Sequence, residues 1–192
     1  FSNDAFGQHY AVSDLFNDNV DECELYQEAL KYFSNILTPF SRFVTKKIEE
    51  LKGLNLPVDM IAPAHGVIWR RDPMQIVNKY YEWASGSSSN SAVIVYNSMW
   101  GATYKMAEFI AKGLKAAGVS YKIFNVPKAD RNDIIREIFK AKGLLIGSPT
   151  VNNGILPSLA SVMDEVVGLK FINKIGAAFG SYGWSGESPK IL

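Results

Sequence analysis

The chain has 192 residues, of which 47% are hydrophobic and 20% are charged, an ordinary composition for a globular protein. Its net charge of +1 and the lack of a dense lysine and arginine cluster argue against a nucleic-acid-binding protein. The single cysteine, Cys23, excludes an internal disulfide, and no apolar run approaches the roughly 18 residues that a membrane span needs. We therefore expect a soluble, cytoplasmic protein that binds neither nucleic acid nor a membrane.

A short stretch rich in serine, residues 85–91, separates two segments of different character. Small polar residues of this kind form flexible linkers. Residues 1–84 carry 8 basic against 12 acidic side chains, a net charge of −4, whereas residues 92–192 carry 12 against 7, a net charge of +5. We interpret the chain as two domains and a linker. The opposite charges are either ordinary solvated surfaces or help the halves, or two copies, to dock.

The first segment is predicted to be mainly helical. Apolar residues recur every three to four positions over residues 20–37, which is typical of an amphipathic helix. A threonine and a proline predict the start of a second helix, over residues 38–52. Residues 58–62 predict a short apolar strand, and a proline begins a further helix predicted over residues 73–84.

In the second segment, apolar strands alternate with helices. Strands are predicted over residues 92–96, 120–125, 143–147 and 174–180, and helices over residues 103–117, 131–140 and 156–167. The first and third strands are continuous apolar runs, as expected for strands that are buried on both faces. Strands that alternate with helices imply right-handed crossovers, so the predicted fold class is α/β with a doubly wound parallel sheet.

Ligands of such sheets bind beyond the carboxyl ends of the strands, which makes the loops there the candidate site. The loop after the first strand contains Ser98, Met99, Trp100, Gly101, Ala102 and Thr103. Hydroxyl groups at a helix N-terminus, together with the converging backbone N–H groups, suit a phosphate monoester. The loop is neither a Walker loop nor a Gly-x-Gly-x-x-Gly loop. The alternative is a plain strand–turn–helix with a serine cap.

Two further loops at the same edge combine polar and aromatic residues. The loop after the third strand contains Pro149, Thr150, Val151, Asn152, Asn153 and Gly154, and the loop after the fourth contains Ser181, Tyr182, Gly183, Trp184, Ser185 and Gly186. The first of these loops offers polar groups to the edge of a flat heterocycle. Tyr182 and Trp184 are natural stacking partners for an aromatic ring system, with simple packing as the alternative.

The pattern Ser98-x-x-Gly101-x-Thr103 resembles the phosphate loop of flavodoxins, Thr/Ser-x-Thr-Gly-x-Thr, except that Met99-Trp100 replaces the middle hydroxyl. The phrases GSPTVNNG and FGSYGWSG resemble the flavodoxin domain of flavodiiron proteins in particular. That family couples an FMN domain to a metallo-β-lactamase-like domain with two irons. The resemblance implies a flavodoxin-like sheet of order 2-1-3-4-5 with FMN bound by the residues of the three loops.

The first segment resembles the same family. FSNDAFGQH at residues 1–9 is similar to the stretch whose aspartate bridges the two irons, which implies that role for Asp4. PAHG at residues 63–66 is similar to the stretch with the last histidine ligand, here His65. A carboxylate can bridge two cations, and a neutral imidazole can bind one. The resemblance thus implies metal-binding and catalytic roles for both residues, whereas His9 matches no ligand position.

The family's other iron ligands and the fifth strand of the sheet are not among these residues. We therefore expect an internal piece of a longer protein, inactive alone. Residues 1–84 would be the end of the αββα metallo-β-lactamase-like domain, residues 85–91 a linker, and residues 92–192 most of the flavodoxin-like domain.

The resemblance implies an oxidoreductase in which FMN takes electrons from a donor such as rubredoxin or a reductase. Two iron ions would then reduce O2 to water or NO to N2O, in a head-to-tail homodimer or a dimer of dimers. Three alternatives remain. One is an FMN electron carrier with a metal-free first domain. Another is a metallo-hydrolase with an appended flavodoxin domain. The third is a cofactor-free interaction domain.

Overall fold

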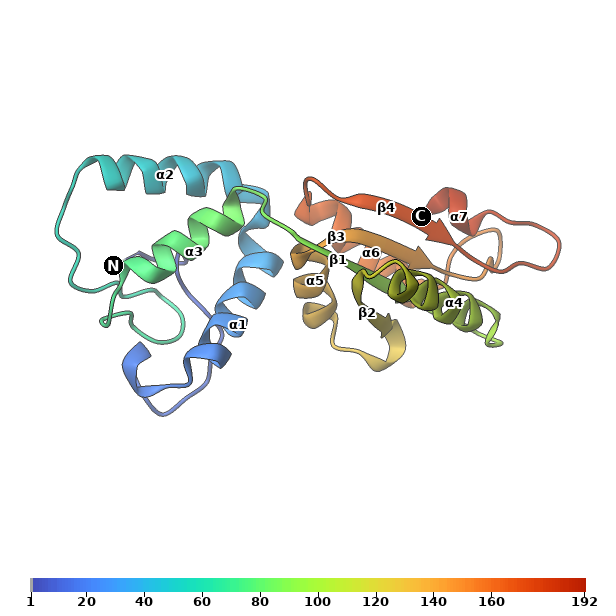
Figure 1. Cartoon of the computed structure of the whole chain (residues 1–192), viewed down its shortest axis with the longest axis horizontal. Coiled ribbons are helices and arrows are strands. Elements are labelled where there is room, and N and C mark those ends of the chain that lie inside the picture. Colours follow the sequence, from blue (N-terminus) through green and yellow to red (C-terminus); the bar gives the residue numbers. More distant parts are fainter. Residues whose placement is uncertain (1) are drawn as a thin grey trace. The chain divides into compact units, whose positions relative to one another are not determined.

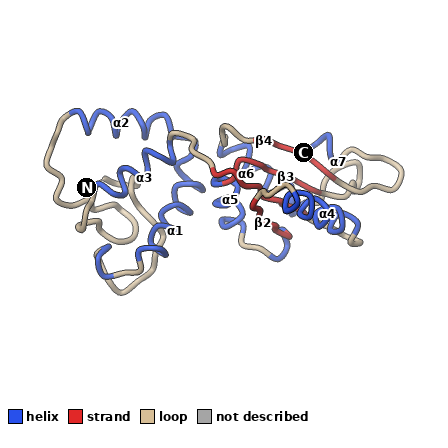
Figure 2. The backbone as a smooth tube through the Cα atoms, viewed as in Figure 1, coloured by secondary structure: helices blue, strands red, loops and turns tan. Residues whose placement is uncertain are grey.

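A computed structural model describes residues 2–192, which leaves Phe1 of the first motif outside the described residues. The chain divides into two compact units, residues 1–87 and 88–192 (Figures 1 and 2). Residues 89–91, which were expected in the linker, belong to the first strand, β1 (Ser89–Tyr96). Ser91 pairs there with Ser120, and the Ser89 hydroxyl donates to the Lys140 carbonyl over 3.0 Å. Backbone pairing thus outweighs a composition that is typical of linkers.

The first unit contains three α-helices, α1 (Glu22–Tyr32), α2 (Ser41–Gly53) and α3 (Met74–Ala84). The helix predicted over residues 20–37 starts as expected, because the Asp21 side chain accepts a hydrogen bond from the Glu24 N–H and caps it. It does not run regularly to its predicted end. A π-helical turn (Phe33–Leu37) replaces its last residues, and a 3-10 turn (Thr38–Phe40) replaces the first residues of the helix predicted over residues 38–52. The Thr38 hydroxyl donates to the Ser34 carbonyl over 2.9 Å at this break.

The strand predicted over residues 58–62 was wrong. In this part of the described chain, Ile61 forms only an isolated antiparallel bridge with Trp69, through two backbone hydrogen bonds of 2.9 Å. Val58 and Met60 are 41% and 50% exposed. The apolar run therefore lies on one surface of the unit and lacks the two buried faces of a central strand.

The second unit is built on a four-stranded parallel sheet of order β2-β1-β3-β4. Besides β1 it contains β2 (Ser120–Asn125), β3 (Ala141–Gly147) and β4 (Ile175–Phe179). This order confirms the doubly wound α/β prediction for the strands present. The change of direction lies between β1 and β3, where a doubly wound sheet opens a crevice for ligands.

Helices cover both faces of this sheet (Figure 1). They are α4 (Ala102–Ala116), α5 (Arg131–Lys140), α6 (Pro157–Leu169) and the short α7 (Ser188–Ile191). Val93 and Val95 of β1 share a core with α5 and α6, whereas Ile94 and Tyr96 share one with α4. β1 is thus apolar on both faces, which explains its continuous apolar run. Within residues 2–192, no helix combines the length and apolarity that crossing a membrane requires.

The carboxyl end of β3 is packed tightly against β4 at a glycine. A Cβ atom on Gly147 would lie 2.3 Å from Cε2 and Cζ of the Phe179 ring, far inside contact distance. Gly176 of β4 is different, because a Cβ there would meet no atom within 4 Å. Alanine substitutions at these two glycines add the same methyl group to a strand. Only the one at Gly147 also causes overpacking.

We predict that Gly147→Ala lowers the free energy of unfolding by about 1–3 kcal/mol, because the Phe179 ring must move. Urea denaturation followed by far-UV circular dichroism measures this change. Gly176→Ala is the matched control and is expected to be neutral or slightly stabilising. Equal stability of the two variants would contradict the packing argument.

Candidate functional site

The loop between β1 and α4 is shaped by a glycine in the left-handed region. Gly101 has a φ of +83° at the N-cap of α4, and its N–H donates to the Ser98 hydroxyl over 3.1 Å. A Cβ at this position would meet no atom within 4 Å, so the backbone conformation and not crowding requires glycine. The first N–H groups of α4 have no intrahelical acceptor and lie beside the Ser98 hydroxyl. This arrangement suits an anion.

Asn97 holds the loop in place and was missed in the sequence. Its backbone N–H donates to the Gly147 carbonyl of β3 over 3.0 Å, and its side-chain oxygen accepts from the Ser98 N–H over 2.7 Å. Its side-chain nitrogen donates to the Ser158 hydroxyl of α6 over 2.5 Å. The available signal was a polar residue directly after a buried strand, which one sequence does not distinguish from an ordinary turn residue.

The three predicted loops meet at Ser181. The hydroxyl of Thr103, which is fully buried, lies 3.0 Å from the Ser181 hydroxyl, so the loop after β1 is joined to the loop after β4. The Thr150 N–H donates to the Ser181 carbonyl over 2.8 Å, which joins the loop after β3 as well. Residues far apart in the sequence thus form one connected surface at the carboxyl edge of the sheet.

The loop after β3 ends in a tight two-residue turn. Val151 and Gly154 exchange backbone hydrogen bonds of 2.9 and 3.1 Å. The residues between them, Asn152 and Asn153, have φ values of +50° and +59°, and asparagine tolerates this left-handed conformation better than most residues. The turn therefore carries two side-chain amides on its tip.

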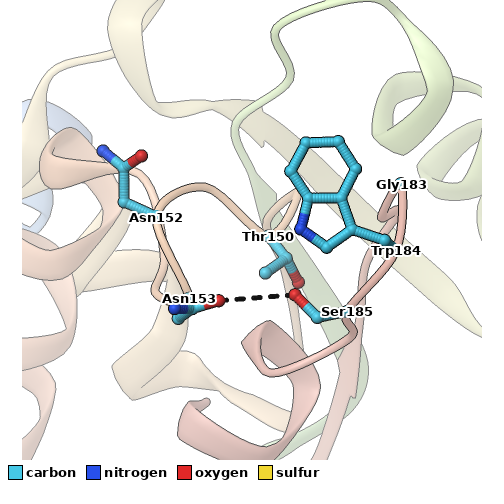
Figure 3. A pocket seen from close by; sticks show the side chains of 6 residues that line it. All are labelled: Thr150, Asn152, Asn153, Gly183, Trp184 and Ser185. Atoms are coloured by element: carbon cyan, nitrogen blue, oxygen red, sulfur yellow. Dashed lines mark hydrogen bonds between the residues drawn. The ribbon is translucent and has the colours of Figure 1, made fainter.

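A hollow of about 330 Å³ lies between this turn and the loop after β4 (Figure 3). It is lined by Thr150, Asn152, Asn153, Gly183, Trp184 and Ser185. The Ser185 hydroxyl donates to the Asn153 side chain over 3.4 Å across the hollow, and the Trp184 indole is 95% exposed. An indole exposed to this extent beside polar groups fits an aromatic ligand with polar substituents.

The remaining predicted residues lie around the hollow without lining it. Tyr182 packs against its own loop, because a Cβ on Gly186 would lie 3.3 Å from its ring. Met99 and Trp100 extend from the loop between β1 and α4 and are 50% and 91% exposed. The wall of the hollow contains Trp184 and not Tyr182. The sequence offered both aromatic residues as stacking partners and did not distinguish them.

Two buried serines support the hollow and were not predicted. The Ser148 hydroxyl accepts from the Leu156 N–H over 3.0 Å, and the Ser148 carbonyl accepts from the Ser188 hydroxyl over 2.8 Å. The Ser188 N–H in turn donates to the Thr150 hydroxyl over 3.2 Å. Because Thr150 lines the hollow, these bonds fix one of its walls.

In the first unit, the two predicted metal ligands lie together. The distance from His65 Nε2 to Asp4 Oδ1 is 3.3 Å, and both side chains are about half exposed. The His9 and His65 rings meet edge to face with centroids 5.6 Å apart. Tyr32 lies 5.9 Å from the His65 ring, and burial and then the Asp4 carboxylate raise the pKa of its hydroxyl.

A buried glutamine, absent from the predicted site, sets this geometry. The Gln8 side chain is fully buried, accepts from the Val67 N–H over 2.7 Å and donates to the Val67 carbonyl over 3.2 Å. Gly66 has a φ of +81°, and a Cβ there would lie 1.3 Å from the Gln8 side-chain oxygen. The segments that carry Asp4 and His65 are thus clamped together.

The Asp4–His65 pair alone does not make a metal centre. Within residues 2–192, no group of three or more His, Cys, Asp and Glu side chains is arranged to hold a metal ion. An iron pair needs more ligands than these residues supply.

Comparisons with known proteins agree with this geometry. The profile of the family described as Flavodoxin matches residues 94–192. The anaerobic nitric oxide reductase flavorubredoxin of Klebsiella pneumoniae is 52% identical over 100% of this chain and 40% of its own length. A nitric oxide reductase of Moorella thermoacetica is 50% identical over 99% of this chain and 48% of its own length. The chain thus spans less than half the length of these relatives.

Solved structures give the same result. The rubredoxin oxygen:oxidoreductase of Desulfovibrio gigas superposes with a TM-score of 0.96 at 41% identity, over 100% of this chain and 48% of that chain. A flavodiiron protein of Giardia intestinalis gives a TM-score of 0.91 at 32% identity, over 98% of this chain and 46% of that one. The chain belongs to the flavodoxin family. Its resemblance to flavodiiron proteins over both units is confirmed.

We predict that Gln8→Leu lowers the free energy of unfolding of the first unit by about 2–4 kcal/mol, because it leaves two buried backbone groups of Val67 unpaired. Tryptophan fluorescence, which includes the fully buried Trp69, follows this transition in urea. Gln27→Leu, on the exposed side of α1, is the control and is expected to change stability little. A Gln8 variant as stable as the control would contradict the clamp.

Proposed function

We propose that the second unit binds FMN, and that the phosphate lies in the loop between β1 and α4. The junction of the three loops at Ser181 is the observation that carries this proposal, because it joins the anion-binding loop to the walls of the hollow. Ser98, Gly101, Ala102 and Thr103 would bind the phosphate with hydroxyl and backbone donors. The neutral donor set fits a monoester held by hydrogen bonds rather than by lysines.

The isoalloxazine ring would occupy the hollow between the loops after β3 and β4. Trp184 would stack on the ring system, and the Asn152–Asn153 turn with Thr150 would bind its polar edge. The other residues of these two loops would surround the ring: Pro149, Val151, Gly154, Tyr182, Gly183, Ser185 and Gly186. Met99 and Trp100 would lie at the phosphate end. A bound FMN would supply redox chemistry, because a flavin can accept two electrons and release them one at a time.

For the first unit we propose the C-terminal part of a metallo-β-lactamase-like domain, residues 1–84. The linker to the flavodoxin-like domain is shorter than the sequence predicted, residues 85–88, because β1 begins at Ser89. Asp4 would bridge two iron ions and His65 would bind one of them, together with ligands from elsewhere in the whole protein. The 3.3 Å approach of the two side chains supports this assignment. A carboxylate and an imidazole are also a ligand combination that iron accepts.

For the whole protein we propose a flavodiiron oxidoreductase that reduces NO to N2O or O2 to water. The names of two similar proteins, nitric oxide reductase and rubredoxin oxygen:oxidoreductase, support this proposal. Its partners would be a redox donor such as rubredoxin or a reductase, and a second copy of the chain arranged head to tail.

The second candidate is an FMN electron carrier whose first unit holds no metal. The match of the flavodoxin profile to residues 94–192 supports a flavin domain in both candidates, and they differ in whether the first unit holds iron. Iron content distinguishes the two functions, because the carrier would contain FMN but no iron when the full-length protein is purified from iron-replete cells.

We predict that Ser98→Ala weakens FMN at least tenfold more than riboflavin, since only FMN has the phosphate and a charge-assisted bond contributes roughly 1.5–3 kcal/mol. Thr103 is left intact, because its buried hydroxyl also joins the loops at Ser181. Quenching of flavin fluorescence measures both affinities. Ser161→Ala removes an exposed hydroxyl of α6 and serves as the control. Equal losses for both ligands would refute the phosphate assignment.

For iron, we predict that Asp4→Asn in the full-length protein removes iron and leaves FMN bound, because asparagine lacks the negative charge of a bridging carboxylate. Reduction of NO and O2 should fall to background while reduction of the flavin persists. Asp14→Asn, an exposed aspartate away from His65, is the matched control. Two tightly bound irons per chain in the Asp4 variant would show that the metal site lies elsewhere.

A further inference from the structure

The outward face of α4 carries an apolar group that no residue of the described chain covers. Phe109 is 70% exposed, whereas Ala107 and Ala111 of the same helix are buried in the core on the sheet. Residues three and four positions away are neighbours on a helix surface, so Phe109 is surrounded by Lys105, Met106, Lys112 and Gly113. We call these five residues the Phe109 patch.

The patch is basic as well as apolar. The Lys112 ammonium lies 4.8 Å from the centroid of the Phe109 ring, and Lys105 is exposed on the opposite side of it. Together with Lys115, α4 carries three lysines against a single acid, Glu108, whose carboxylate already accepts a hydrogen bond from the Tyr104 hydroxyl over 2.5 Å. An apolar centre with a rim of positive charge fits a partner with a rim of negative charge.

Gly113 gives an independent reason to expect an external partner. Glycine weakens a helix interior, and a Cβ at this position would meet no atom within 4 Å. Its φ is not positive, so neither crowding nor backbone conformation within the described chain calls for glycine here. The missing side chain leaves a flat place beside Phe109, where the surface of another molecule can approach the helix closely.

The position of the patch indicates what the partner does. α4 begins at the proposed phosphate loop, and Phe109 lies six residues beyond Thr103, which corresponds to about 9 Å along the helix axis. A protein seated on the patch is therefore near the phosphate end of the proposed FMN site. Among possible partners, one that exchanges electrons with the flavin has the most to gain from this location.

We propose that the Phe109 patch is the docking surface of a small acidic electron-transfer protein that reduces the flavin. The inference rests on the proposed FMN site. Two reduced partner molecules each lose one electron in successive encounters, and one FMN takes up both electrons with two protons from solvent. The lysines steer the encounter, and Phe109 and Gly113 form the close contact.

The test uses full-length FMN-loaded protein with reduced rubredoxin as the acidic probe. Lys105→Glu combined with Lys112→Glu is expected to lower kcat/KM for rubredoxin at least tenfold, through KM, and to abolish its decrease with rising salt. Photoreduction of the FMN, which needs no protein partner, should be unchanged. The control is Lys128→Glu combined with Lys170→Glu, an equal charge change outside α4 that should alter kcat/KM little.

Gly113→Gln separates docking from folding. Glutamine favours the helix, so the denaturation midpoint should rise, while the added side chain should raise KM for rubredoxin several-fold. Unchanged kinetics in the lysine and glycine variants, or an equal loss in the control pair, would overturn the proposal. So would a change of oligomeric state with intact rubredoxin kinetics, which would assign the patch to a second copy. Loss of the proposed function is recognised separately, because the wild-type protein would then hold no FMN.

Discussion

The contacts made by Ser181 are the constraint on which the candidate flavin site depends. A parallel sheet brings the ends of β1, β3 and β4 to one edge, but it leaves the loops beyond them free to diverge. The buried Thr103 hydroxyl and the Thr150 N–H both bond to Ser181, so the loop between β1 and α4 and the walls of the hollow keep one spacing. Burial makes these bonds hard to break, because an unpaired polar group there would be costly.

The first unit uses the same principle with a side chain in place of a sheet. Gln8 satisfies both backbone groups of Val67, and the left-handed Gly66 leaves room for the glutamine. These contacts keep the segments of Asp4 and His65 close together, while both side chains remain about half exposed. In both units, exposed side chains of the candidate sites are supported by buried, hydrogen-bonded polar residues such as Gln8 and Thr103, which gives rigidity without burying the exposed side chains themselves.

Periodicity in the sequence was sufficient where an element makes its contacts along one regular face. The strand over residues 120–125 and the helix over residues 131–140 have the predicted bounds. Prediction failed where distant partners decide the outcome: residues 58–62 lack a neighbouring strand, and Ser89 is drawn into β1 by pairing with Ala141. The supporting residues Gln8, Asn97, Ser148 and Ser188 were missed for the same reason, because their roles lie in bonds to residues far along the chain.

Locally unfavourable residues lie on both of the surfaces that we propose to meet other molecules. Trp184 and Phe109 keep large apolar rings in water, and Gly113 weakens the helix that carries it. No contact within the described chain requires glycine at Gly113, whereas Gly147, which is also a glycine in a regular element, is explained by the Phe179 ring. A locally unfavourable residue that a contact within the chain explains serves packing. One that no such contact explains is a candidate for binding another molecule. At Trp184 this leads to the hollow for a flat ligand, and at Phe109 to a surface that fits another protein.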